Sequence, residues 1–431
     1  MRDMGVVGAG GAGFPTYGKL SEKADTILMN CAECEPLLDL HKQLLKQHPR
    51  EILKAFHLIA ETLSAKEVVI GIKEQYESTI IALEEHLEDF PLVRIQKLSG
   101  TYPMGDEIVL IYETTGRVVP PGALPIECGV AVFNVETLYN VYCALWEKKP
   151  VIEKYVTIAG EVEHPVTVHV PIGTRIKDVV AMAGQVTTKH PVYLLGGPMM
   201  GRFGQDYEPI VKTTNAIIVL PKEHSLVYKK STRFSVSVAR AASSCCQCQT
   251  CTDLCSRQSL GHPVNPHLFM RAAANRDFSN TNVYLNTLFC SSCGLCELYS
   301  CPQGLSPRSM IAEYKNELRK NGIRPQKIQA EPVKASREYR KVPEERLVAR
   351  LGLNKYDIGA PLKEEVPTMK EVKILLSQHI GAPAQPLVKE GDAVKKGDVI
   401  AKAGEGLSVD IHASIDANVK EVTNKYIRCE R

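Results

Sequence analysis

The chain has 431 residues, of which 44% are hydrophobic and 23% charged, and a formal net charge of +3. This length predicts about three globular domains, and the small net charge gives no sign of binding to nucleic acid or to a membrane surface. No uncharged apolar run is long enough for a membrane span. Fourteen cysteines without a secretory leader indicate a reducing compartment, so we expect a cytoplasmic protein.

The first motif is a glycine-rich loop, GAGGAGFPTYGK at residues 8–19. Glycines at Gly8, Gly10, Gly11 and Gly13 let backbone N–H groups approach a phosphate, and Lys19 adds a positive charge. A tight structural turn is the alternative, because such a loop alone is a weak signal. The pattern is not that of an ordinary Rossmann dinucleotide fold.

Strands and helices alternate over residues 1–148 and predict an α/β domain. We expect strands ending near Asn30 and over residues 68–72 and 93–97, with helices over 39–61 and 75–87. The first strand ends in an amide and two carboxylates, Asn30, Glu33 and Glu35, placed like polar groups at the carboxyl edge of a sheet. Glu107 lies in a loop before a further predicted helix. The alternative for the three glutamates is a role as solvated loop carboxylates.

A second domain is predicted over residues 149–235. Alternating strands over 154–171, a helix over 172–184 and a closing strand over 216–220 follow the order of a β-grasp fold. His164 and His169 are better explained as strand histidines than as metal ligands, because no cysteine or second carboxylate stands at metal spacing.

Two cysteine runs mark a third domain, residues 236–322. Their spacings are C-x2-C-x2-C-x3-C and C-x2-C-x2-C-x4-C-P, formed by Cys245, Cys248, Cys251, Cys255 and by Cys290, Cys293, Cys296, Cys301. These spacings predict two [4Fe–4S] clusters in a helical ferredoxin-like domain. In two-cluster ferredoxins the fourth cysteine of each run binds the other cluster, so we expect Cys301 to join the first run and Cys255 the second. Zinc or disulfides are the alternatives, and Cys246 is expected to be a bystander. Helices are predicted over 266–275 and 307–320.

Residues 323–368 are rich in charge and proline and predict a linker with a short helix. Residues 369–431 repeat a turn–strand pattern similar to that of biotinyl and lipoyl modules, a barrel-sandwich hybrid. No Asp-Lys or Met-Lys stands at the expected hairpin tip near residues 410–414, so we expect neither lipoylation nor biotinylation.

Four motifs of the first domain resemble, in order, those of the flavin-binding (NADH dehydrogenase) subunit of respiratory complex I and of the Rnf complex C subunit. They are GAGGAGFPTYGK, NCAECEP from Asn30, YPMGDE from Tyr102 and NVET from Asn134. One departure is Ala32, where complex I carries an aspartate. The resemblance implies an α/β multidomain protein with a Rossmann-like FMN/NADH domain followed by a soluble-ligand-binding β-grasp (SLBB) module.

The same resemblance implies roles for particular residues. FMN would be held by Gly8, Gly10, Gly11, Gly13 and Lys19, and surrounded by Asn30, Glu33, Tyr102, Gly105, Asn134 and Thr137. NADH would stack near Phe14, with Glu35 and Glu107 near its polar groups. A flavin suits this arrangement because it converts a two-electron hydride donor into one-electron transfers.

In the Rnf C subunit a similar barrel-sandwich module lies at the N-terminus, whereas here it is C-terminal. That order resembles the cobalamin reductases of propanediol-utilisation microcompartments. The resemblance implies an NADH-dependent oxidoreductase that passes electrons through FMN and two [4Fe–4S] clusters to a cobalamin or corrinoid enzyme, inside a bacterial microcompartment and beside its shell. The alternatives are an electron-relay subunit of an Rnf-like or proline-reductase-type system, or a scaffold with structural clusters. No corrinoid motif of the form D-x-H-x-x-G is present.

Overall fold

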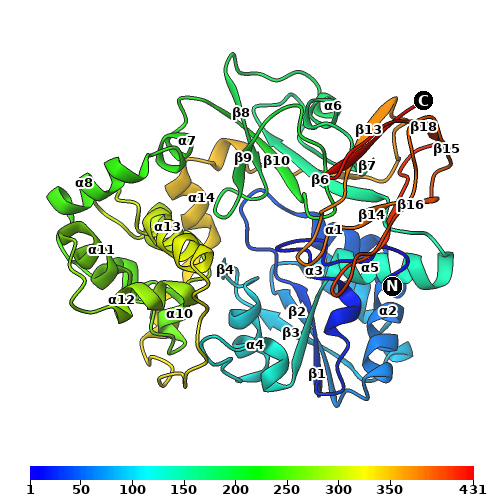
Figure 1. Ribbon diagram of the computed structural model, residues 1–431. Helices are drawn as coiled ribbons and strands as arrows, with labels where there is room; N and C mark the ends of the chain where they lie inside the picture. The colour runs from blue at the N-terminus through cyan, green and yellow to red at the C-terminus, as the bar shows by residue number, and fades with distance from the viewer.

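A four-stranded parallel sheet organises the first part of the computed structural model, which describes residues 1–431 (Figure 1). Its order is β3-β2-β1-β5. The strands are β1 (Thr26–Cys31), β2 (Glu67–Lys73), β3 (Val93–Leu98) and β5 (Val130–Asn134). Helices cover both faces, so β1 is an almost continuous apolar run rather than an alternating one. All carboxyl ends point to one edge, where the polar residues predicted from the sequence gather.

Five helices accompany this sheet: α1 (Leu40–Gln47), α2 (Pro49–Thr62), α3 (Glu77–Glu84), α4 (Glu107–Thr115) and α5 (Val135–Tyr142). Alternate residues of β1 face opposite sides. Ile27 packs in a core with Phe56 of α2 and Leu138 of α5, whereas Leu28 packs in a second core with Leu110 of α4. The predicted single helix over 39–61 is two helices, because Pro49 at the start of α2 lacks an N–H and disfavours helical backbone at His48.

A six-stranded mixed sheet of order β12-β7-β6-β10-β8-β9 follows. Its strands are β6 (Glu153–Gly160), β7 (Val166–Pro171), β8 (Pro191–Leu195), β9 (Arg202–Gly204), β10 (Ala216–Pro221) and β12 (Leu362–Lys363). Helix α6 (Ile176–Val180) is shorter than predicted and continues as a 3-10 turn, Ala181–Ala183. It buries Ile176 and Val179 against Val156 and Ile217, which gives the helix-on-sheet packing of a β-grasp.

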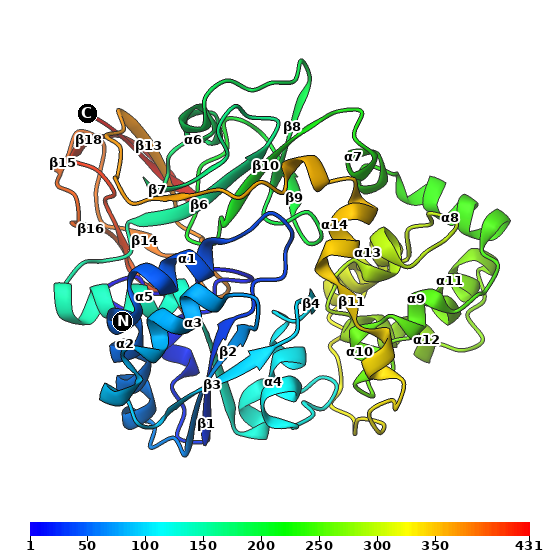
Figure 2. The same cartoon turned by 180° about the vertical axis from the view of Figure 1, so that it is seen from behind.

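Short helices form the cysteine-containing module at one end of the molecule (Figure 2). They are α7 (Ser225–Lys230), α8 (Phe234–Ser244), α9 (Thr250–Asp253), α10 (Ser256–Ser259), α11 (Pro266–Asn275), α12 (Asn282–Leu285) and α13 (Pro307–Lys320). Helices α11 and α13 have the predicted bounds, each with proline at its first position. No helix of the chain combines the length and apolar character needed to cross a membrane.

Residues 323–368 hold more structure than a linker. Strand β11 (Val342–Pro343) pairs with β4 (Thr101–Tyr102), and helix α14 (Glu344–Leu351) follows it. Leu347 of α14 is fully buried in a core shared with Tyr102 and Met199. This segment therefore connects the first α/β domain, residues 1–148, to the six-stranded sheet, which β12 extends by pairing with β7.

The C-terminal strands form two small sheets, β13-β19-β18-β15 and β14-β16-β17, at the end opposite the cysteine module (Figures 1 and 2). They are β13 (Glu371–Leu375), β14 (Gln385–Pro386), β15 (Ala393–Val394), β16 (Val399–Lys402), β17 (Ile411–His412), β18 (Ala417–Val422) and β19 (Tyr426–Glu430). Ile380 N–H donates to the carbonyl of Ala12 at 3.1 Å. The barrel thus rests on the glycine-rich loop.

Candidate functional site

The glycine-rich loop has the conformation that its glycines permit. Gly11 and Gly13 have φ of +61° and +66°, values that side chains disfavour. A Cβ at Gly11 would meet no atom within 4 Å, whereas one at Gly13 would lie 2.8 Å from Thr213 and 3.2 Å from the backbone of His379. One part of the loop is therefore open and another is covered by the β-grasp segment and the barrel.

Lys19 and the end of β5 close the base of this loop. The Lys19 ammonium donates to the carbonyl of Val132 at 2.7 Å and lies 3.6 Å from the carboxylate of Glu107. Asn134 caps α5, because its Oδ1 accepts the N–H groups of Glu136 and Thr137. The Thr137 hydroxyl accepts the N–H of Ala9. A helix N-terminus thus meets the glycine loop, which is the arrangement that binds phosphate.

Two further predicted residues lie at the carboxyl end of β1. Asn30 donates from Nδ2 to the carbonyl of Gly105 at 2.9 Å and accepts the N–H of Ala32. A Cβ on Gly105 would lie 2.5 Å from the Ala32 carbonyl, so only glycine fits there. Thr16 and Asn215, both near the loop, each have a buried side-chain oxygen without a hydrogen-bond partner. Open glycines, unpaired polar atoms and a helix N-terminus fit a flavin phosphate and its sugar chain.

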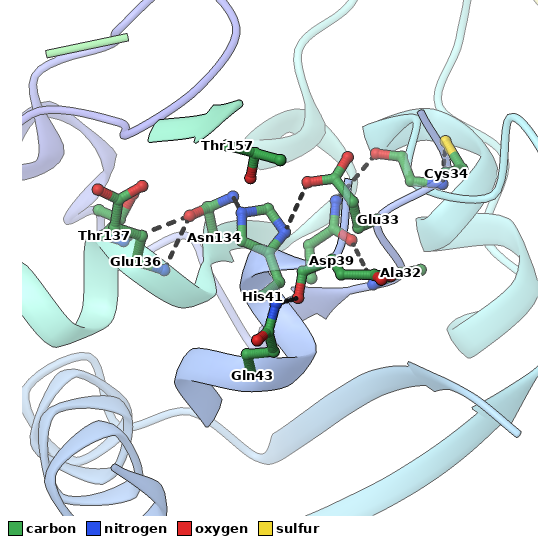
Figure 3. A network of polar contacts seen from close by, with 12 residues as sticks. Ala32, Glu33, Cys34, Asp39, His41, Gln43, Asn134, Glu136, Thr137 and Thr157 are labelled. Atoms are coloured by element: carbon green, nitrogen blue, oxygen red, sulfur yellow. Dashed lines mark hydrogen bonds and ion pairs between the residues drawn. The ribbon is translucent and has the colours of Figure 1, made fainter. Parts of the chain in front are cut away.

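Glu33 belongs to a polar network that connects β1 to β5 (Figure 3). His41 Nδ1 lies 3.1 Å from Glu33, and His41 Nε2 lies 2.9 Å from Asn134 Nδ2. Burial raises the pKa of Glu33 to about 7 and lowers that of His41 to about 4. His41 was missed in the sequence because a histidine within an amphipathic helix gives no signal of its partners.

Three residues that the resemblance assigns to nucleotide binding lie against other parts of the folded chain. Glu35 accepts the N–H groups of Met199 and Met200, each at 2.8 Å, and burial raises its pKa to about 7. The Tyr102 hydroxyl donates to the carbonyl of Cys293 at 2.6 Å. Phe14 lies against Gly18, where a Cβ would be 2.9 Å from its ring and 3.1 Å from Leu407 of the barrel. Glu35 and Tyr102 therefore face neighbouring modules.

The two cysteine loops share one backbone pattern. In the first, Gln247 and Gln249 have φ of 54° and 63°; in the second, Ser292 and Gly294 have φ of 62° and 87°. These are the second and fourth residues after the first cysteine of each run. When residues with left-handed backbone conformation alternate with residues of negative φ, successive N–H groups point to the inside of the loop, as in anion-binding nests at iron–sulfur sites. Ser292 N–H, for example, lies 3.3 Å from the sulfur of Cys290.

The eight cysteines form two groups of four. Cys245, Cys248, Cys251 and Cys301 line one cavity, which Cys246 also borders. Cys255 lies near the second loop instead: burial raises the pKa of its thiol, and the charges that add most to this effect are those of Cys293 and Cys290. No three side chains converge as for a single metal ion; a cubane instead holds its ligands around four irons. Two sets of four cysteines fit two [4Fe–4S] clusters.

Cys246 and Cys248 are exposed, whereas Cys296 is buried. The group that contains Cys248 therefore lies nearer the surface, and the group that contains Cys296 lies against the first α/β domain. Two residues that the sequence reasoning missed mark this contact. Arg257 donates from both terminal nitrogens to Asp106, at 2.7 and 2.9 Å. The only indication of this contact in the sequence is that Arg257 follows Cys255 by two positions.

Four family models match the chain in the order of its modules. The Nuo51 FMN-binding domain matches residues 1–143, the SLBB domain 155–203, the 4Fe-4S dicluster domain 244–306 and the RnfC barrel sandwich hybrid domain 359–430. These matches confirm the predicted fold class and the prediction of FMN and two [4Fe–4S] clusters as cofactors. The chain is a flavo-iron–sulfur electron-transfer protein.

Comparison with individual proteins shows which family within this class the chain belongs to. Cobalamin reductase PduS of Salmonella typhimurium (strain LT2) is 40% identical over 435 residues, which cover 100% of this chain and 95% of the relative. Cobalamin reductase PduS of Citrobacter freundii is 40% identical over 432 residues, 99% of this chain and 94% of the relative. The chain belongs to the PduS cobalamin reductase family, as the order of its modules predicts.

More distant relatives share part of the chain. The C subunit of the ion-translocating oxidoreductase complex of Edwardsiella ictaluri is 34% identical over 265 residues, 59% of this chain and 31% of the relative. A crystal structure of an NAD+-reducing [NiFe]-hydrogenase in the H2-reduced state has a TM-score of 0.50 at 20% identity, and the match covers 75% of this chain and 62% of that one. The hydrogenase likeness concerns the fold alone.

Proposed function

We propose that the chain is an NADH-dependent cobalamin reductase in which one NADH supplies two electrons and reduces two molecules of cob(III)alamin to cob(II)alamin. The observation that carries the proposal is the 40% identity to cobalamin reductase PduS over the whole chain. When bound, FMN supplies the conversion from hydride to single electrons, and the clusters carry those electrons onward. We further propose that the protein acts in a bacterial microcompartment, with shell or corrinoid proteins as partners.

The chain's own residues would bind and orient these groups. Gly8, Gly10 and Gly11 would admit the flavin phosphate to backbone N–H groups beside the N-terminus of α5, with Lys19 supplying positive charge. Asn30, Gly105, Asn134 and Thr137 lie at the same sheet edge and would contact the rest of FMN. Glu107, which is paired with Lys19, is the carboxylate that would meet NADH, and the ring of Phe14, which lies beside Gly18, would stack on the nicotinamide.

The eight clustered thiols would each supply one iron ligand. Cys245, Cys248, Cys251 and Cys301 would hold one cluster. Cys255, Cys290, Cys293 and Cys296 would hold the other. Tyr102 and Asp106 of the first α/β domain contact the chain segments that hold the second group of cysteines. This group therefore lies at the interface with the domain that would bind FMN.

The test is a visible spectrum of anaerobically purified protein, recorded after NADH is added with and without cob(III)alamin. We expect NADH alone to bleach the flavin and iron–sulfur bands, and cob(II)alamin to form when the corrinoid is present. Absence of bleaching would contradict the use of NADH.

A relay protein within a larger complex is the second candidate, and the match to the C subunit of the ion-translocating complex over 59% of the chain favours it. In that case NADH would bleach the protein, but cobalamin would stay oxidised until a partner protein was supplied. The same spectroscopic measurement therefore distinguishes a cobalamin reductase from a relay protein.

A further inference from the structure

The turn at residues 102–106 contacts both chain segments that supply the second group of cysteines. Tyr102, which is 3% exposed, donates its hydroxyl to the carbonyl of Cys293 at 2.6 Å. At the other end of the turn, Asp106 accepts two hydrogen bonds from Arg257, two residues after Cys255. Neither of these two contacts reaches the Cys245–Cys251 loop or Cys301.

These contacts are largely shielded from solvent. The Asp106–Arg257 pair is nearly buried, with side chains 15% and 10% exposed, and a two-pronged guanidinium–carboxylate pair fixes orientation as well as distance. Asp106 also caps α4 by accepting the N–H groups of Ile108 and Val109. The turn itself is held by the pairing of β4 with β11. The position of the turn therefore fixes the separation of the two cysteine segments.

Cubane ligation by two segments far apart in sequence needs such a constraint, because the three thiols of one loop cannot position the fourth. We propose that the 102–106 turn is a positioning device for the cluster held by Cys255, Cys290, Cys293 and Cys296, and that Tyr102 acts on this cluster rather than on the flavin. The inference rests on the proposed cluster ligation, but not on NADH or cobalamin as substrates.

The first test is Arg257→Gln, which removes the two-pronged pair and leaves the cap of α4 intact. We expect the anaerobically purified variant to contain about half of the wild-type iron and acid-labile sulfide, because one of two clusters is lost. Arg319→Gln, an exposed arginine at the end of α13, is the matched control and should keep the full content. Full iron content in Arg257→Gln, with both wild-type electron paramagnetic resonance (EPR) signals, would overturn the proposal.

The second test is Tyr102→Phe, which removes only a hydroxyl. We expect both clusters to remain and one EPR signal to change its g-values, because the hydrogen bond that orients the backbone of Cys293 is lost. Tyr284→Phe is the control, since it removes a similar bond to the carbonyl of Asp277. Unchanged EPR signals together with weaker FMN binding would show that Tyr102 serves the flavin, and would overturn the proposal.

These readouts need no turnover. If cobalamin reduction fails but Arg257→Gln loses half its iron, the proposed activity is wrong and the positioning role stands. If the wild-type protein reduces cobalamin and both variants keep wild-type clusters, the positioning role is wrong and the activity stands.

Discussion

His41 Nδ1 lies 3.1 Å from the carboxylate of Glu33 and carries the proton of the neutral imidazole. Asn134 determines this tautomer. Its Oδ1 is occupied by two backbone N–H groups of α5, so its Nδ2 must donate to His41 Nε2. Since Nε2 accepts, the proton of the neutral imidazole stands on Nδ1. The cap of α5 thereby sets the protonation of a group at the end of β1.

This pair predicts opposite pH dependences for two variants. Burial raises the pKa of Glu33 from an ordinary 4.5 to about 7, so the folded state binds the extra proton and stability falls as pH rises through this window. Burial lowers the pKa of His41 from 6.5 to about 4, so the unfolded state binds the extra proton and stability rises with pH there. The two effects oppose each other in the wild type.

Relative to the wild type, we therefore expect the pH slope of the urea midpoint to become more positive in Glu33→Gln between pH 4.5 and 7. In His41→Gln we expect this slope to become more negative between pH 4 and 6.5. One proton changes the free energy of unfolding by at most about 1.4 kcal/mol per pH unit. Urea unfolding at several pH values measures this. Equal slopes in both variants would contradict the assignment.

Serine substitution of the cysteines should remove EPR signals in two sets. Cys255→Ser and Cys293→Ser should lose or alter the same signal, and Cys248→Ser and Cys301→Ser the other, because Cys248 and Cys301 line one cavity and Cys255 lies near Cys293. Cys246→Ser, beside a ligand but exposed, should keep both signals. The crossed arrangement is wrong if Cys255→Ser alters the same signal as Cys248→Ser.

Alanine at Gly11 and Gly13 should separate two roles of the glycine loop. Both residues have positive φ, so each change costs about 1 kcal/mol in backbone strain. At Gly11 the new methyl group meets nothing within 4 Å, and we expect little loss of stability but weaker FMN binding. At Gly13 it collides with Thr213 and the backbone of His379, so the melting temperature should also fall. Titration of apoprotein with FMN, followed by fluorescence, together with thermal unfolding, measures both effects.

The ion pair of Lys154 and Glu136 should respond differently to single and double substitution. Both side chains are 1% exposed. Lys154→Met leaves a buried carboxylate without its partner and should destabilise the protein by about 3–5 kcal/mol. The double variant Lys154→Met with Glu136→Gln should recover most of this loss, as urea unfolding would show. A double variant as unstable as the single one would mean that packing, not charge, is responsible.

The features that could be predicted from the sequence are those that depend on the spacing of residues close together in the chain. The bounds of α11 and α13 follow from proline and helical composition, and the loops of both cysteine runs follow from two-residue gaps. It did not predict contacts between distant segments. Glu35 and Tyr102 were assigned to the nucleotide by resemblance, but Met199 and Cys293 reach them only in the folded chain. The packing of α14 was missed because its eight residues lie in a charged, proline-rich stretch.

The pairing of Tyr102 with Val342 has a consequence for biosynthesis. Because the amino-terminal part of a chain leaves the ribosome first, all eight cluster cysteines emerge before the strand that immobilises the 102–106 turn. The nascent second site is therefore still adjustable when its last cysteine, Cys296, appears. All eight thiols can therefore be present before β4 pairs with β11, and a chain truncated before residue 342 would carry the ligands without the strand that holds the 102–106 turn.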